Sequence, residues 1–147
     1  MNSKISLLTL VAAACLAGCS TTSLHQEPSG PPVAAAHTTP LAGVEATEAR
    51  QAATSFLQAV ASRDWNAVAK FWPPHAPSRF EDVFTEKTKA VVGGLQIISI
   101  GGPYREDSAS PGVFVPYAVR FTNGDVQRNN LQLMKNSDGQ WVWLGGF

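Results

Sequence analysis

The clearest potential for chemistry in this sequence lies at Cys19, near the amino terminus. Leu16, Ala17 and Gly18 precede this cysteine, and Ser20 follows it. The small side chains of Ala17 and Gly18 allow a peptidase to approach the backbone, and a thiol can be converted to a thioether. These residue types at this spacing make Gly18 and Cys19 a candidate processing site, with a thiol that can be modified.

The residues before Cys19 have the composition of a delivery segment. Lys4 is basic, and residues 5–16 are almost wholly apolar. This apolar run is typical of a signal-peptide core and is too short for a membrane-spanning helix, which needs about 20 apolar residues. The stretch Leu16-Ala17-Gly18-Cys19 resembles the lipobox of bacterial lipoproteins. An ordinary signal peptide, in which Cys19 has no role, is the alternative.

The resemblance to lipoproteins implies a lipid anchor and a location. The chain would be cleaved between Gly18 and Cys19, and diacylglycerol would be attached to the sulfur of Cys19. The new amino terminus would be acylated, with palmitate as a typical chain. Ser20 stands where an aspartate would imply retention in the inner membrane, so for a Gram-negative cell the resemblance implies the outer membrane, facing the periplasm. The expected partner of Cys19 is therefore the lipid bilayer.

The composition excludes several classes of function. The chain has 147 residues with 11 basic and 11 acidic side chains; removal of residues 1–18 takes away Lys4 and leaves a net charge of −1. Such a balance provides no bulk attraction to nucleic acid. The two cysteines are Cys15, in the leader, and Cys19. The mature domain therefore has no thiol for a disulfide, a metal site or a nucleophile.

Candidate binding residues are concentrated toward the end of the chain. A polar group could bind a carboxylate or a peptide laid on a sheet, or could be a solvated face; it comprises Tyr117, Arg120, Arg128, Asn129 and Asn130. The tryptophans could line a ligand cavity or simply form the core; they are Trp65, Trp72, Trp141 and Trp143.

Acid–base and metal chemistry have weak support. His75 is the one histidine after residue 43, and it lies among prolines in an expected loop. As a general acid or base it would need a carboxylate partner, for which Glu81 or Asp82 is near in sequence. A metal ion needs three or more convergent ligands, and the scattered carboxylates do not predict them. We therefore predict no catalytic residue, no metal and no cofactor.

The elements that carry these residues follow from composition and periodicity. Residues 20–43 are rich in Ser, Thr, Ala and Pro and predict a disordered tether. Residues 44–147 predict one domain. Helical spacing covers residues 44–60 and 65–72, and Ser78 with Glu81 predicts a third helix that ends near Gly93. After Gly94 the period is two, which predicts an antiparallel sheet of about four strands.

The hairpin at Asn123-Gly124 allows a prediction of register. A two-residue turn there would pair Phe121 with Val126. That register would place Leu131 and Leu133 on the wrong face, so we predict a β-bulge near residues 128–130 that returns both leucines to the core and curves the sheet.

Two short motifs carry a resemblance at the level of the fold. Residues 56–60 run into Arg63-Asp64-Trp65, and Asp138-Gly139 leads into Trp141-Val142-Trp143. These resemble the long helix, the acidic-aromatic corner and the final strand of the nuclear-transport-factor-two-like superfamily. The resemblance implies an α+β, cystatin-like fold, in which N-terminal helices pack on a curved antiparallel sheet.

Three functional hypotheses remain open from the sequence. The first is an envelope lipoprotein with a non-catalytic domain that binds a small apolar ligand or a protein partner. The second is an accessory component of an envelope or secretion assembly. The third is a small enzyme that acts on a hydrophobic substrate in a cavity between helices and sheet.

Overall fold

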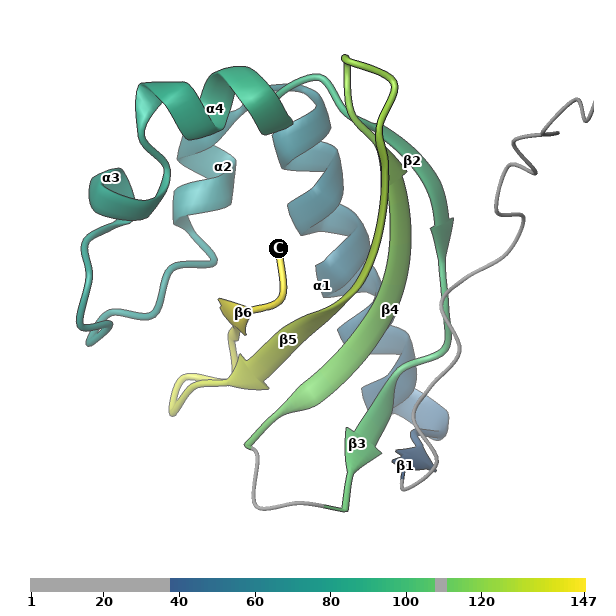
Figure 1. Ribbon diagram of the computed structural model, residues 1–147. Helices are drawn as coiled ribbons and strands as arrows, with labels where there is room; N and C mark the ends of the chain where they lie inside the picture. Colours follow the sequence, from purple (N-terminus) through teal and green to yellow (C-terminus); the bar gives the residue numbers. More distant parts are fainter. Residues whose placement is uncertain (1–37, 108–110) are drawn as a thin grey trace, which may run out of the picture.

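The computed structural model describes residues 38–107 and 111–147, which form an α+β domain (Figure 1). The helices are α1 (Gly43–Ala61), α2 (Trp65–Ala69), α3 (Phe80–Val83) and α4 (Glu86–Val92). The strands are β1 (Thr38–Pro40), β2 (Gln96–Ile100), β3 (Tyr104–Glu106), β4 (Val113–Arg120), β5 (Val126–Lys135) and β6 (Trp141–Gly145). Cys19, Gly18 and the predicted leader lie outside the described residues. None of the described helices is long and apolar enough to cross a membrane.

Helix α1 forms because its apolar residues recur at helical spacing and face the sheet. Its buried stripe consists of Ala49, Ala52, Ala53, Phe56, Leu57, Ala59 and Val60. At the corner that follows, the Asp64 carboxylate accepts a hydrogen bond of 3.0 Å from the Ala67 amide and caps α2.

The predicted third helix is two helices. Phe84 leaves the helical conformation, with a ψ angle of 60°, and the hydroxyl of Thr85 accepts from the Thr88 amide to begin α4. The predicted cap at Ser78 is also displaced by one residue, because the Asp82 carboxylate accepts from the Arg79 amide at 3.2 Å. The break allows Phe84 to turn into the core, where it is 2 % exposed.

All six strands belong to one open antiparallel sheet, in the order β1-β3-β4-β5-β6, with β2 beside β4. The sequence predicts about four strands. The two additional strands are short: one is β3, and the other is β1, which lies inside the predicted tether and pairs with β3 through Thr38 and Glu106. The Leu41 amide continues this contact by donating to the Pro103 carbonyl at 2.9 Å. The folded domain therefore begins earlier than residue 44, because β3 offers β1 a free edge to pair with.

The predicted bulge at residues 128–130 is wrong, although the two leucines do face the core. Arg120 pairs with Val126, and the register is regular from there to the pair of Val113 and Leu133. The extra residue lies in the turn instead: the Gly124 amide donates to the Phe121 carbonyl, and Gly124 has a φ of 94°. A three-residue loop with glycine in the left-handed region shifts the register by one without a bulge in the strands.

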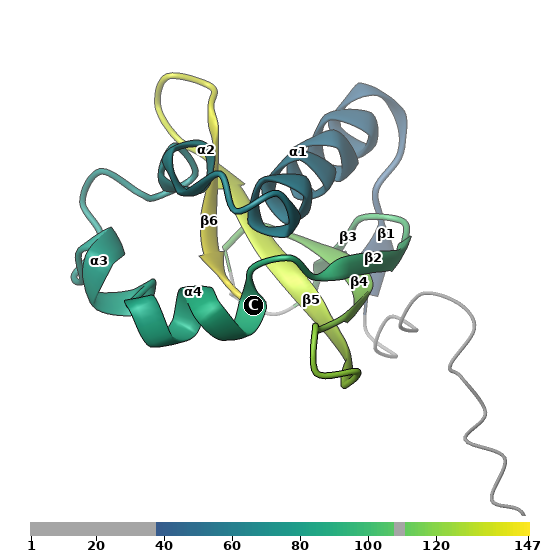
Figure 2. The ribbon, with the colours of Figure 1, turned by 90° about the horizontal axis from the view of Figure 1, so that it is seen from above.

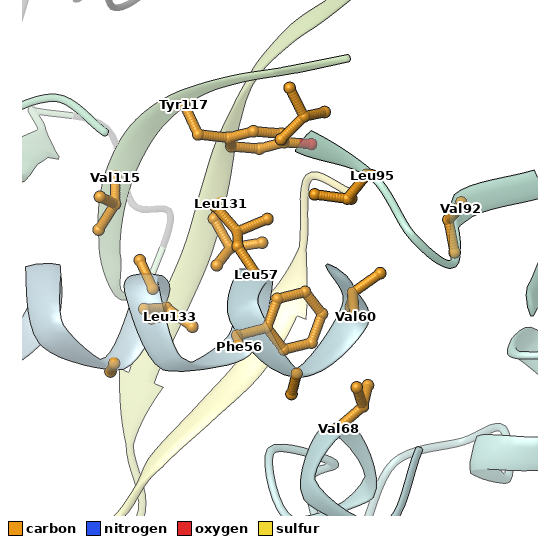
Figure 3. Packing of buried hydrophobic residues seen from close by; sticks show 14 of the residues in the cluster. Phe56, Leu57, Val60, Val68, Val92, Leu95, Val115, Tyr117, Leu131 and Leu133 are labelled. Carbon is orange, nitrogen blue, oxygen red and sulfur yellow. The ribbon is translucent and has the colours of Figure 1, made fainter. Parts of the chain in front are cut away.

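The core lies between α1 and the concave face of β4 and β5, which curve around the helix (Figures 1 and 2). In Figure 3, Leu57 of α1 lies toward Leu131, and Tyr117 of β4 lies beyond it. Leu57, Leu131 and Tyr117 are all fully buried. Irregular pairing between Ile97 and Ser99 on β2, and between Gln132 and Leu133 on β5, interrupts the ladders, and such irregularities increase the local twist of a sheet.

Candidate functional site

The space between the helices and the sheet is filled by aromatic rings. The Phe56 ring on α1 lies 5.6 Å from Phe71, 5.9 Å from Trp143 and 5.5 Å from Phe147, measured between ring centroids. Phe84 extends this group of rings, because its ring centroid lies 5.9 Å from that of Trp143. Edge and offset contacts at these distances are favourable, so this part of the domain is a packed core.

The last described residues close that space from the sheet side. They turn back from β6 and end between α4 and the sheet (Figures 1 and 2). The Tyr117 hydroxyl donates a hydrogen bond of 2.9 Å to the Gly146 carbonyl, and the Phe147 ring stacks 6.1 Å from the Tyr117 ring. Burial raises the pKa of the Tyr117 hydroxyl well above its usual value, while a hydrogen bond from Gln127 opposes the shift. Tyr117 is therefore a neutral core residue.

An open apolar groove lies beside this core, between β6 and the loop that joins α2 to α3. Its volume is about 400 Å³, within the range of small-molecule sites. We call it the apolar groove; it is lined by Trp72, Pro73, His75, Ala76, Pro77, Ser78, Val83, Trp143 and Leu144.

Two hydrogen bonds hold the walls of the apolar groove. The Trp72 indole N–H donates to the Ser78 carbonyl at 2.9 Å, which closes the proline-rich loop on the tryptophan ring. The Trp143 amide donates to the Phe71 carbonyl at 2.7 Å, which ties β6 to the chain after α2. The two indole rings lie 5.3 Å apart as a result. Because prolines limit the loop further, the groove is largely preformed.

His75 lies at the rim of the apolar groove with an exposed side chain. The lining of the groove includes no carboxylate. Asp82 is engaged by Arg79, whose side-chain and backbone hydrogen bonds lower the pKa of the Asp82 carboxyl. Among the described residues, no group of three His, Cys, Asp or Glu side chains could hold a metal ion.

The structure separates the predicted polar cluster. Tyr117 faces the core, whereas Arg128 and Asn129 are exposed. Arg128 pairs with Ala118 and Asn130 pairs with Pro116, and alternate residues of a strand point to opposite faces. Arg120, Arg128 and Asn130 therefore lie on the face of the sheet away from Tyr117, and the five residues do not form one site.

The structure also separates the two tryptophans of β6. Trp143 lines the apolar groove, whereas Trp141 lies over a more polar hollow, where the Lys135 ammonium is 5.3 Å from its ring centroid. Neither ring is fully buried.

The sequence reasoning missed Phe71, Leu144 and Phe147. Phe71 lies in the turn after α2, and Leu144 is the second-last residue of β6; neither belongs to a periodic apolar pattern. Phe147 had a possible signal, since it follows Gly145-Gly146, a pair that permits a sharp turn of the chain.

No family model matches the chain, and no curated protein or solved structure matches it in the comparisons made. Fold and site together define an α+β domain with a filled interior and an open apolar groove at the end of its helical layer.

Proposed function

We propose that this protein is a lipid-anchored envelope protein whose domain binds a small apolar ligand in the apolar groove. The observation that carries the binding role is the pair of indole rings of Trp72 and Trp143 at the groove, only 5.3 Å apart. Exposed aromatic surface in a concave, preformed site is typical of ligand binding. The ligand class is a neutral molecule with a flat apolar ring.

The anchor in this proposal is the acylated Cys19. Each buried methylene of a fatty chain contributes about 0.8 kcal/mol, so several chains together hold a protein stably on a bilayer. The amino-terminal motif and Ser20 support the outer membrane, with the domain in the periplasm. The tether is then the part of residues 20–43 that precedes β1.

The proposal includes a cystatin-like fold for the domain. A long helix, α1, packs in the concave face of a curved antiparallel sheet, and short helices follow it along the chain. These features support the finer class, as do the motifs at residues 56–65 and 138–143.

The binding role is tested with Val83→Glu, which places a charge in the wall of the apolar groove. The matched control is Val91→Glu on α4, where the valine is 51 % exposed and does not line the groove. The probe is N-phenyl-1-naphthylamine, a neutral fluorophore. We expect Val83→Glu to weaken its binding about tenfold, because a buried charge without a partner is costly, and Val91→Glu to bind as the unmodified protein does. Equal binding by the two variants would refute the site.

The anchor is tested separately, by membrane fractionation of cells. Cys19→Ala should move the protein from the membrane to the soluble fraction, whereas the control Cys15→Ala changes a cysteine in the leader and should leave it in the membrane. Continued membrane residence of Cys19→Ala would refute lipidation at that residue.

A second candidate function, a small enzyme acting on a hydrophobic substrate, rests on His75 at the groove rim. Its test is the turnover of a hydrophobic ester by the protein and by His75→Gln. Turnover that disappears in His75→Gln, with binding of the fluorophore retained, would favour the enzyme over the binding module.

A further inference from the structure

A second groove lies on the other side of the Trp143–Phe71 hydrogen bond. Its volume is about 430 Å³, and it shares no lining residue with the apolar groove. We call it the Trp141 groove; it is lined by Glu48, Gln51, Ala52, Ser55, Phe71, Lys135, Gly139 and Trp141.

The Trp141 groove combines apolar and hydrogen-bonding groups in similar measure. Phe71, Ala52 and Trp141 provide apolar surface, the first two from the helical layer and the last from β6. Gln51 and Ser55 are exposed on α1. They lie four residues apart, so their side chains share one face of the helix. The groove thus offers an amide and a hydroxyl beside aromatic rings.

The charges of the Trp141 groove are already paired. Lys135 donates to the Glu48 carboxylate, and its ammonium lies 5.3 Å from the centroid of the Trp141 ring. A charged ligand would have to separate this pair. A neutral ligand can leave it intact and use the lone pairs of the carboxylate and the remaining ammonium protons, since an ammonium has three donors and a carboxylate several acceptor sites.

We infer that the Trp141 groove binds a neutral saccharide. A pyranose ring has a face of C–H groups, which packs favourably on the negative face of an aromatic ring. It also has a rim of hydroxyls that both donate and accept hydrogen bonds. The groove offers both kinds of surface. The partly exposed rings of Phe71 and Trp141 can meet the C–H face, although the Lys135 ammonium lies over one face of Trp141. Gln51, Ser55 and the Glu48–Lys135 pair can meet the hydroxyls.

The surface next to the groove suits a chain of sugars better than a single ring. A hollow of about 300 Å³ shares Lys135 and Trp141 with the groove and continues past Glu45, Arg105 and Met134. Here too the charges are paired, because Arg105 donates to Glu45. The inferred ligand is therefore a neutral oligosaccharide or glycan strand that passes Trp141.

The test is isothermal titration calorimetry of the full-length protein in zwitterionic detergent micelles. The two probes are N,N′,N″-triacetylchitotriose and maltotriose, which represent N-acetylhexosamine glycans and glucans. The variants are Trp141→Ala and Gln51→Ala. The matched control is Gln58→Ala, because Gln58 is exposed on α1 two turns beyond Gln51 and outside the groove.

We expect at least one trisaccharide to bind. The trisaccharide that binds shows whether the ligand is an N-acetylhexosamine glycan or a glucan. Trp141→Ala should weaken binding about tenfold through loss of the ring contact. Gln51→Ala should weaken it about threefold to tenfold through loss of a hydrogen bond, and Gln58→Ala should not change it. Gln51 is a surface residue, so its variant stays interpretable if Trp141→Ala fails to fold. Binding of neither sugar, or equal binding by Gln51→Ala and Gln58→Ala, overturns the inference.

This inference is independent of the proposed apolar ligand. The fluorophore test with Val83→Glu addresses the apolar groove. The saccharide proposal and the apolar-ligand proposal can therefore be refuted separately.

Discussion

The Tyr117 hydroxyl donates a hydrogen bond of 2.9 Å to the Gly146 carbonyl, and this contact joins the middle strand of the sheet to the last described residues. It fixes the turn by which the chain leaves β6 and brings the Phe147 ring against Phe56. The space in which a ligand would lie between helices and sheet is therefore occupied by the protein's own side chains. Potential binding surface is found in the grooves outside that space.

Gly146→Ala should destabilise the domain strongly. Gly146 has a φ of 83°, and a Cβ atom there would lie 1.8 Å from the Asn130 carbonyl oxygen, so the backbone must move. We expect a loss of about 2–3 kcal/mol in the free energy of unfolding, measured by urea denaturation. The matched control is Gly145→Ala, because a Cβ at Gly145 meets nothing within 4 Å. Equal stability of the two variants would contradict the placement of Gly146.

Tyr117 should make the domain sensitive to alkaline pH. Its pKa in the folded state is raised by burial, whereas in the unfolded chain it is about 10. Well below pH 10 both states are protonated and no stability is lost. Above pH 10 the unfolded state loses its proton first, so stability falls as pH rises, by about 1.4 kcal/mol at pH 11.

The measurement for Tyr117 is the urea midpoint between pH 8 and pH 11. Tyr117→Phe cannot ionise at this position, so its stability should depend less on pH than that of the unmodified protein. At pH 8 its free energy of unfolding should be lower by about 1 kcal/mol, because it lacks the hydrogen bond to Gly146. Parallel curves for the two proteins would show that Tyr117 ionises equally in both states.

Phe147 should contribute to stability as a core residue. Its ring contacts Phe56, Phe84 and Tyr117. Because it is only partly buried, we expect Phe147→Ala to cost about 2–3 kcal/mol, below the range for fully buried phenylalanines. Phe147→Leu should recover part of this loss. An unfolding free energy unchanged in Phe147→Ala would show that the ring does not pack there in solution.

The segment that carries β1 should belong to the cooperative domain. Leu41 packs against the core, and its amide donates to the Pro103 carbonyl. Leu41→Ala should lower the melting temperature, through a loss of about 1–2 kcal/mol. Val44→Ala, three residues later, is the control because Val44 is 75 % exposed. If the two substitutions have the same small effect, the domain begins after Leu41, as its composition alone suggests.

Local patterns were sufficient for the class of the fold and for several elements. The apolar stripe of α1, the Asp64 cap and the alternation along β4 all reflect interactions within a few residues, which the sequence displays directly. The motif Leu16-Ala17-Gly18-Cys19, which resembles a lipobox, also depends only on neighbouring residues, and the chemistry that the resemblance implies stays a prediction. The sequence assigns Leu131 and Leu133 of β5 to the core because they are apolar, although the register of a two-residue turn places them on the other face.

The features that depend on distant contacts could be found only in the tertiary structure. The register of the whole hairpin depends on whether the turn at Asn123-Gly124 has two residues or three, and the sequence permits both. Strand β1 forms because it pairs with β3, which lies more than sixty residues later in the chain. Trp141 and Trp143 share a face of β6, and the bond from Trp143 to Phe71 decides that they line different grooves. Sequence spacing determines local conformation; long-range packing decides which side chains meet.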